Sequence, residues 1–431
     1  MLSHQRQWNP EIVGASEEMD KLSLDSAVSS EGLASNSAGE ISEDDIQISA
    51  DLTVSEIEKI KNLKTEIGKE LLEKTPLMND EFSLHRWICG WDNKVAEILP
   101  RYAQMSEIVE ALGFNEFVVN DEDEVNTTVV KYNHLAQFFA GGVMGFDNDG
   151  DLITCSFLGN VRPRTLVKCG STHQVFKMAI LDAVLIMKLL KKREEKTGKQ
   201  AGCKIIMDLS GFGMEHLFAP TVKIYLNLIK LLQDMFPELT RKIYVINSPT
   251  IFTTAFGLIK PILSEKTRSK IEILGSNYQK FLLEELGEHN VYPLYGGSKK
   301  PTKGDSETGT LRMGGVPHKE NIYNPIYCPH SVDDDKLTKI NVPARSKKSL
   351  DFECKAGQTL KWFFKSSGDI DLSVYLDNKI LYMPKLRLNT EFVPEFDEVL
   401  CKADGTYSII FDNSFSTFFS KDVRHHIQIV D

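Results

Sequence analysis

The sequence contains no long apolar run. No stretch of about 18 or more mainly apolar residues occurs, whereas a helix needs about 20 of them to cross a bilayer. The N-terminus also lacks the basic region and the following apolar region of a secretory signal peptide. Any contact with a membrane is therefore expected to be peripheral.

Closely spaced cysteines are missing as well. The seven cysteines stand at positions 89, 155, 169, 203, 328, 354 and 401, without a CxxC pair or a short metal-binding spacing. An odd, scattered set is typical of reduced thiols in an intracellular protein. The sequence therefore predicts neither a disulfide framework nor a metal site.

An excess of positive charge is absent. The net charge is −11, and residues 1–50, with ten acids and two bases, contribute −8 of it. The rest of the chain is close to neutral, which disfavours a nucleic-acid partner. Residues 1–50 contain ten serines but no Phe or Tyr, so they cannot bury enough apolar surface to offset their chain entropy. They are predicted to be a disordered, acidic, serine-rich leader.

No complete catalytic or cofactor motif is present. The run IIMDLSGFGMEHL at 205–217 has Gly211 and Gly213 of a dinucleotide-binding fingerprint, but His216 stands where the third glycine belongs. The next strand ends in Asn247-Ser248, without the acid that binds ribose. GxSxG, Walker A and HExxH motifs are absent. We therefore predict no catalytic residue and no cofactor, and a surface or packing role for His216.

Three acids in GFDNDGDLITC resemble the start of a calcium-binding loop. They are Asp147, Asp149 and Asp151. The sixth loop position is Leu152 rather than Gly, and Leu158 stands where the twelfth-position glutamate belongs. The pattern favours a hairpin turn instead.

The periodicity of apolar residues divides the rest of the chain. Helical spacing predicts a lobe over 51–115, with a capping box at Ser55 and Glu58, a helix after Asp80 and a third helix broken at Pro100. Alternating helices and strands then predict a largely parallel sheet over 130–300. The expected elements are helix 171–198, strand 203–209, helix 217–236, strand 242–247, helical segment 252–265, strand 271–275 and helix 276–286. A Gly/Lys/Thr-rich linker at 301–315 precedes period-two runs over 316–431, which predict an antiparallel β-sandwich.

Several runs resemble the CRAL-TRIO (Sec14-like) lipid-binding family. They are FPEL at 236–239, IYVINSPTIFTTAFGLIKPIL at 243–263, SEKTRSKIEILGSNYQKFLLEEL at 264–286 and YPLYGG at 292–297. DLSGFG is similar to the family's Asp-x-x-Gly turn, and FSLHRWICGWDNKVAEIL, with Arg86-Trp87, resembles its helical N-terminal lobe. LKWFFKSSGDIDLSVYL and CKADGTYSIIFDNSFSTFFSKDV resemble a GOLD domain. The combination is similar to Sec14-like proteins with a C-terminal GOLD domain, such as tocopherol-associated proteins and supernatant protein factor.

The resemblance implies that the apolar helix within 249–263 is a gate that closes a lipid cavity. Phe252, Phe256, Ile259 and Leu263 share one face of this helix and are expected to line the cavity or to touch a bilayer. Gly257 and the flanking Pro249 and Pro261 suit a segment with mobile ends. The alternative from periodicity alone is a helix that is buried in the core.

Glu238 and Lys270 match the family's head-group residues. The resemblance implies that they bind an inositol phosphate, because a carboxylate accepts from hydroxyls and an ammonium pairs with phosphate. The alternative is a structural ion pair. The basic residue that often accompanies them in the N-terminal lobe has no clear counterpart.

The sequence as a whole predicts a non-enzymatic, cytoplasmic protein that binds and transfers or presents a lipid. The ligand is a hydrophobic molecule or phospholipid: phosphatidylinositol, phosphatidylcholine, squalene, tocopherol and retinoid all stay open. The GOLD domain is expected to add contacts with proteins or with membranes, the Golgi among them, and a basic region between Lys336 and Lys365 is one surface for this. The alternative is that strand alternation scatters these charges over a solvated surface. One alternative is a lipid-sensing scaffold that recruits signalling or Golgi trafficking proteins. A more distant alternative is a reductase or phosphatase.

Overall fold

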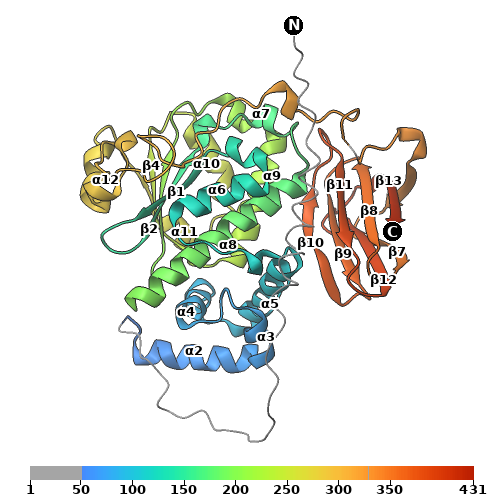
Figure 1. Cartoon of the computed structure of the whole chain (residues 1–431), viewed down its shortest axis with the longest axis horizontal. Coiled ribbons are helices and arrows are strands. Elements are labelled where there is room, and N and C mark those ends of the chain that lie inside the picture. Colours follow the sequence, from blue (N-terminus) through green and yellow to red (C-terminus); the bar gives the residue numbers. More distant parts are fainter. Residues whose placement is uncertain (1–50, 329) are drawn as a thin grey trace, which may run out of the picture. The chain divides into compact units, whose positions relative to one another are not determined.

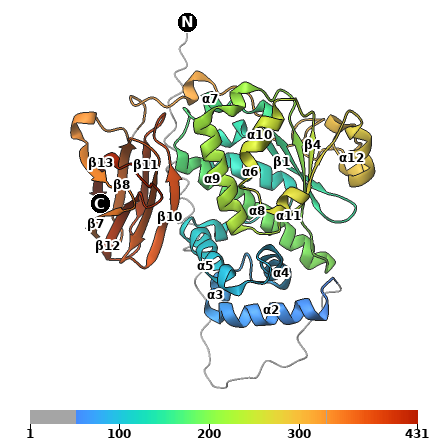
Figure 2. The same cartoon turned by 180° about the vertical axis from the view of Figure 1, so that it is seen from behind.

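The computed structural model describes residues 51–328 and 330–431. The leader predicted for residues 1–50 lies outside the described residues. Residues 51–431 cluster as one compact unit, and Figures 1 and 2 show its helices and strands from two sides. None of the helices in the described ranges is long and apolar enough to cross a membrane.

The first part of this unit is helical. Its elements are α2 (Val54–Ile67), α3 (Lys69–Lys74), α4 (Glu81–Gly90), α5 (Val95–Ala111), η2 (Phe114–Glu116), α6 (Glu122–Tyr132) and η3 (His134–Phe138). The capping box of α2 lies at Thr53 and Glu56, so its predicted position was wrong by two residues. Asp80 caps α4 as predicted.

Helix α5 is not broken at Pro100, as the sequence had suggested. It runs through this proline, with Ile98 and Tyr102 fully buried on either side. Proline removes one intrahelical hydrogen bond, and the burial of these neighbours offsets the loss. The packing of the lobe therefore outweighs the local preference.

The central part is a five-stranded sheet. Its strands are β1 (Gly141–Phe146), β2 (Leu152–Phe157), β3 (Cys203–Asp208), β4 (Thr240–Ile246) and β5 (Ile271–Ile273), in that spatial order. β1 and β2 form an antiparallel hairpin, and β2 to β5 are parallel. The helices of this part are α7 (Pro163–Leu166), α8 (Thr172–Thr197), α9 (Ala219–Met235), α10 (Phe252–Ile259), α11 (Glu265–Ser269) and α12 (Tyr278–Leu286). The predicted mixed α/β fold is confirmed.

The two faces of the sheet are covered by different helices. Because every crossover between parallel neighbours steps in the same direction and is right-handed, α8 and α9 lie on one face, and α12 lies on the other (Figures 1 and 2). Side chains alternate along the strands: Ile206 and Tyr244 pack on the α12 side, whereas Ile205 and Ile243 face α9 and a cavity. The cavity described below therefore lies on the α8–α9 side.

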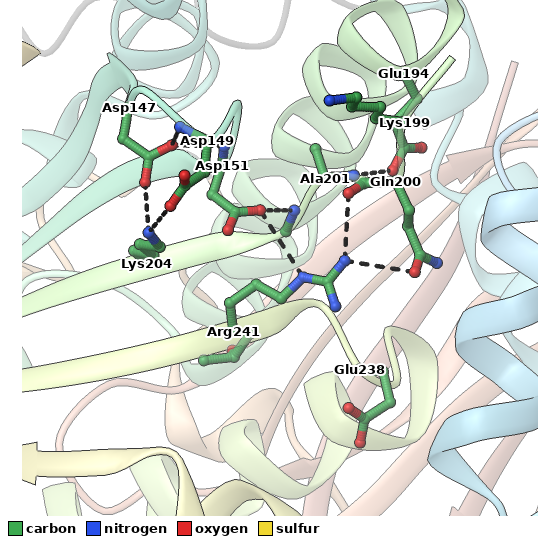
Figure 3. Close-up of polar contacts among 12 residues, drawn as sticks. Asp147, Asp149, Asp151, Glu194, Lys199, Gln200, Ala201, Lys204, Glu238 and Arg241 are labelled. Carbon is green, nitrogen blue, oxygen red and sulfur yellow. Dashed lines mark hydrogen bonds and ion pairs between the residues drawn. The ribbon is translucent and has the colours of Figure 1, made fainter. Parts of the chain in front are cut away.

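The acidic turn between β1 and β2 is a hairpin, as predicted. Asp147 Oδ1 accepts hydrogen bonds from the backbone N–H of Asp149 (3.0 Å) and Asp151 (2.8 Å). Lys204 Nζ lies 2.8 Å from a carboxylate oxygen of both Asp147 and Asp149 (Figure 3). The lysine ammonium thus provides the positive charge of this turn. Among the residues that the structure describes, no His, Cys, Asp or Glu cluster suits a metal ion.

Helix α8 joins the lobe to the sheet. Ser171 caps its start and Gly198 caps its end, which agrees with the predicted helix 171–198 to within one residue at each end. Near its end, Glu194 accepts a hydrogen bond from the backbone N–H of Ala201 (Figure 3). It also accepts hydrogen bonds from Arg86 of α4. Both charged side chains are about 2% exposed. Removing one partner of such a buried pair is strongly destabilising, so this contact holds the lobe on α8.

The C-terminal part is a β-sandwich of two four-stranded antiparallel sheets. Its strands are β6 (Thr338–Val342), β7 (Lys347–Cys354), β8 (Thr359–Ser366), β9 (Ile370–Leu376), β10 (Ile380–Leu388), β11 (Glu395–Leu400), β12 (Gly405–Asp412) and β13 (Lys421–Val430). The sheet orders are β10-β9-β12-β7 and β11-β8-β13-β6. Inward side chains such as Trp362, Leu372 and Phe411 form the core between them. The predicted all-β architecture is confirmed, whereas its assignment as a GOLD domain stays a prediction.

The segment predicted to be a linker, residues 301–315, packs on the sheet and on helix α6. The backbones of Arg312 and Gly141 pair, and the hydroxyls of Thr302 and Thr310 donate to Asp123. The predicted domain boundaries stay predictions.

Candidate functional site

A cavity of about 520 Å³ lies between the sheet and the helices on its α8–α9 side. Its walls come from β3, β4 and β5, from α7 to α11, and from a loop of the C-terminal sandwich. Among the described residues that line it there is no Asp, Glu, Lys or Arg. The interior is therefore suited to a molecule that is apolar over most of its surface.

Helix α9 forms one long wall of this cavity. Val222, Tyr225 and Leu232 face the cavity, whereas Ile224 and Leu231 also pack against the core of the sandwich. An apolar stripe that serves two neighbours is wider than a single core contact requires. The sequence showed an apolar helix here but not that it separates a cavity from a second domain.

All four residues predicted for the gate lie at the cavity wall. They are Phe252, Phe256, Ile259 and Leu263. The Phe252 ring is buried and packs edge to face with Phe212, with centroids 6.3 Å apart, and lies 5.9 Å from the Phe256 ring. The opposite face of α10 is exposed at Thr253, Thr254 and Gly257. Helix α10 is thus a cover over the cavity with one face open to solvent.

The cover ends earlier than predicted. Helix α10 stops at Ile259, and α11 begins at Glu265 with the Ser264 hydroxyl as its cap, so the single helical segment 252–265 was wrong. Pro261 cannot donate a backbone hydrogen bond, which favours a break here. The Gln233 side chain of α9 meets this break, since it donates to Ile262 O and accepts from Ser264 N, both at 3.4 Å.

Glu238 and Lys270 lie together beside the cavity rather than in it. Lys270 Nζ is 2.6 Å from Glu238 Oε2 and 2.7 Å from Thr240 O. Both side chains are about one fifth exposed, and their neighbours Thr240 and Ile271 line the cavity. The structure thus brings the two predicted residues together in an ion pair at the rim.

Two hydroxyls inside the cavity were missed by sequence reasoning. They belong to Thr221 and Tyr225, which are four residues apart on α9 and both line the cavity. Thr221 Oγ1 is buried and has no hydrogen-bond partner among the described residues. Burial raises the pKa of the Tyr225 hydroxyl, so it stays protonated and can donate. These groups can meet a neutral polar group of a ligand.

His216 has a packing role, in line with the sequence. Its ring stacks on Phe212 with centroids 4.6 Å apart, and Nδ1 accepts from the Gly213 N–H. Nε2 lies 3.1 Å from Val161 O. Both ring nitrogens are therefore used within the fold.

One grouping has the composition of a hydrolase triad. Ser171 Oγ and Glu395 Oε2 lie 2.8 and 2.5 Å from His173. Both contact the same nitrogen, Nδ1, whereas a triad places nucleophile and acid on opposite nitrogens. All three residues are also buried. This arrangement is a structural contact between α8 and the sandwich.

The chain is similar to known proteins over most of its length. Residues 137–297 match the family model of the CRAL/TRIO domain. Protein ctg-1 of Caenorhabditis elegans is 25% identical over 311 residues, which cover 69% of this chain and 80% of that protein. A CRAL-TRIO domain-containing protein of the same organism is 25% identical over 399 residues, which cover 88% of this chain and 97% of that protein. Sec14 cytosolic factor of Schizosaccharomyces pombe (strain 972 / ATCC 24843) is 29% identical over 225 residues, which cover 51% of this chain and 75% of that protein.

The matched range coincides with the cavity. Residues 137–297 include the whole five-stranded sheet, α7 to α12 and the four cover residues. The similarity to tocopherol-associated proteins stays a prediction. Residues 137–297 match the CRAL/TRIO domain, and the chain is similar to Sec14-like CRAL-TRIO proteins.

Proposed function

We propose that the protein holds one hydrophobic or phospholipid molecule in this cavity and transfers it between membranes without changing it covalently. The observation that carries the proposal is the wall, which is apolar and free of charged side chains. Burial of apolar surface contributes about 25 cal/mol per Å², so contact alone can retain the ligand. The match to the CRAL/TRIO domain and the similarity to Sec14 cytosolic factor support lipid binding.

Helix α10 acts as the gate in this proposal. Its inner face covers the cavity and its outer face is exposed, so outward movement uncovers the ligand without disturbing the sheet. Gly257 sits in the middle of the helix, and a Cβ at this position would meet nothing within 4 Å. A glycine weakens a helix by about 1 kcal/mol relative to alanine. Helix α10 is therefore weakest near Gly257, and its opening also separates the buried Phe252 and Ala255 from the cluster that they form with Val245 of β4.

The polar end of the ligand has two candidate binding positions. At the rim, Lys270 could exchange its bond to Glu238 for a phosphate. In the interior, the free Thr221 hydroxyl suits the hydroxyl or carbonyl of a neutral lipid. The uncharged wall favours the second place, because a buried charge without a partner is costly.

The sandwich is proposed to contact membranes through one loop. Most of the predicted basic region is neutralised, since Lys336, Lys339, Lys347, Lys355, Lys361 and Lys365 all form ion pairs. At one end, however, Phe418 is 82% and Phe419 72% exposed. These rings lie in the loop 413–420, which Lys421 follows. The backbone N–H of Arg345 donates to the carbonyl oxygens of Asn413 and Ser416 in this loop. Aromatic rings beside basic residues suit an anionic bilayer, such as the cytoplasmic face of the Golgi.

A lipid-sensing scaffold is the second candidate. The match to the CRAL-TRIO domain-containing protein covers 88% of this chain and so extends beyond residues 137–297, which supports a role for the residues outside that range, such as the recruitment of proteins. An enzyme is the most distant alternative, because the described wall residues include no Asp, Glu, Lys or Arg, and both ring nitrogens of the wall residue His216 are occupied by contacts within the fold.

Lipid extraction and a transfer assay test the proposal. Purified full-length protein is expected to carry one lipid class, identified by mass spectrometry of the extract. It is also expected to move a fluorescent analogue of that lipid between donor and acceptor vesicles. Retention without transfer would favour the sensor, and a chemically altered analogue would favour the enzyme. Absence of both lipid and transfer would contradict the proposal.

A further inference from the structure

Part of the cavity wall does not belong to the CRAL/TRIO domain. Asn389, Phe392 and Val393 line the cavity, and they lie in the loop between β10 and β11 of the sandwich. Val393 is 2% exposed. The Phe392 ring packs on Phe218, which precedes α9, with centroids 5.8 Å apart. The sandwich is therefore in direct contact with the space that the ligand would fill.

Hydrogen bonds between side chains and the backbone fix this loop to the start of α8. Thr172 Oγ1 donates to Asn389 O (2.8 Å) and accepts from Asn389 N (3.3 Å). Directly after the loop, Glu395 Oε1 accepts from the N–H groups of Thr172 (2.7 Å) and His173 (3.2 Å). These N–H groups have no partner within the helix, and the positive end of the helix favours a carboxylate. The loop thus begins and ends on the first turn of α8.

A second row of charges reinforces this junction. Asp397 lies 3.3 Å from His173 Nε2 and 2.5 Å from Lys177 Nζ. Burial opposes the charge on Asp397, but its attraction to Lys177 and His173 outweighs burial and lowers the pKa of this carboxyl. The pair therefore stays ionised at neutral pH. A charged junction of this kind is rigid compared with α10, whose outer face has no such partners.

The loop and the gate meet α9 at different positions. Phe392 touches Phe218 before the first turn of α9, whereas the end of the gate contacts Gln233 near its last turn. These two α9 positions are separated by 15 residues, or about 22 Å at the rise of an α-helix. A chain that enters beneath the gate and follows α9 meets the sandwich loop at the far end.

We propose that residues 389–394 are the end wall of the ligand cavity and set the length of apolar chain that the cavity accepts. The sandwich then takes part in ligand selection, in addition to any contact with membranes or proteins. The inference rests on the proposed lipid-binding function, since it concerns the same cavity.

A chain-length series tests this role. Full-length protein is titrated with straight-chain alcohols of increasing length, and displacement of an environment-sensitive dye is measured. Phe392→Ala enlarges the end of the cavity and is expected to shift the preferred length upward, with about a fourfold gain in affinity for each further methylene buried. Val393→Ile adds one methylene to the wall and is expected to weaken binding of the longest accepted alcohol about fourfold. Tyr327→Ala, at an exposed position outside the cavity wall, is the matched control and keeps the wild-type profile.

The outcomes separate this inference from the proposed function. If Phe392→Ala and Val393→Ile fold and keep the wild-type length profile, the loop is not the end wall. If Phe392→Ala fails to fold, the conservative Val393→Ile variant decides. If the wild-type protein binds no alcohol of any length, the proposed function itself fails.

Discussion

Phe256→Asp is the most informative change at the gate. Phe256 is half-buried and lines the cavity. Full burial of a phenylalanine contributes about 1.5–3 kcal/mol, so we expect the half-buried ring to contribute roughly half of that to folding. A lipid in the cavity would instead meet an unpaired carboxylate, whose desolvation costs several kcal/mol. Because each 1.4 kcal/mol is a factor of about ten, ligand affinity should fall at least about 100-fold in a protein that still folds.

Two further variants of α10 separate gating from core packing. Thr254→Asp adds the same charge to the exposed face of the helix and should leave lipid loading unchanged. Phe252→Asp removes a ring that is 5% exposed and should lower the melting temperature sharply, because loss of a buried phenylalanine costs about 3–5 kcal/mol. Loading is measured as co-purified lipid per protein, transfer as exchange of a fluorescent lipid between vesicles, and folding by thermal melting.

The reasoning fails if folded Phe256→Asp carries and exchanges lipid as the wild type does. It also fails if Thr254→Asp is equally impaired, because charge near the helix, rather than the cavity-facing ring, would then be responsible. General unfolding of Phe256→Asp would indicate that α10 is part of the core rather than a gate.

Four other changes test separate parts of the proposal. Gly257→Ala should stabilise α10 by about 1 kcal/mol and slow lipid transfer about fivefold, measured with the vesicle assay; an unchanged rate would show that opening does not bend the helix there. Lys270→Ala should lower the affinity for phosphoinositide vesicles about tenfold if the rim binds the head group, and unchanged cosedimentation of the folded variant would leave Lys270 with a structural role. Thr221→Val should weaken tocopherol binding about fivefold but not squalene binding, and equal effects on both ligands would exclude a hydrogen bond to the ligand. Replacement of both Phe418 and Phe419 by Ser should reduce cosedimentation with anionic vesicles at least about tenfold; retention of binding would move the membrane contact elsewhere.

Much of the fold could be predicted because local signals and packing agree. Helix α8 has Ser171 before its first residue, Gly198 after its last and apolar residues at helical spacing between them, so both ends followed from the sequence. Alternating apolar residues likewise predicted the sandwich strands. The errors fell where tertiary contacts decide: Pro100 is accommodated within α5 because its neighbours are buried.

The candidate site was predictable only in part. Phe252, Phe256 and Ile259 share one face of α10, and Leu263 follows in the same short segment, so their placement at one wall followed from spacing. Phe392 and Val393 lie about 130 residues further along the chain in a loop without a motif, and nothing local distinguishes them from other apolar residues of a sandwich. Thr221 was missed for a similar reason, because an unpartnered hydroxyl can be recognised only when its surroundings are known.

Helix α8 is held at both of its ends by other parts of the chain. Its first turn is bound to Glu395 of the sandwich, and its last turns are bound to Arg86 of the N-terminal lobe. At 26 residues it is about 39 Å long, so it acts as a strut that fixes the spacing between those two attachments. When the gate opens on a bilayer, the lobe and the sandwich should keep their separation, and backbone hydrogen exchange should rise in α10 while α8 stays protected. The same strut would carry a disturbance from one attachment to the other, so damage to the Arg86 contact should be detectable at the sandwich loop.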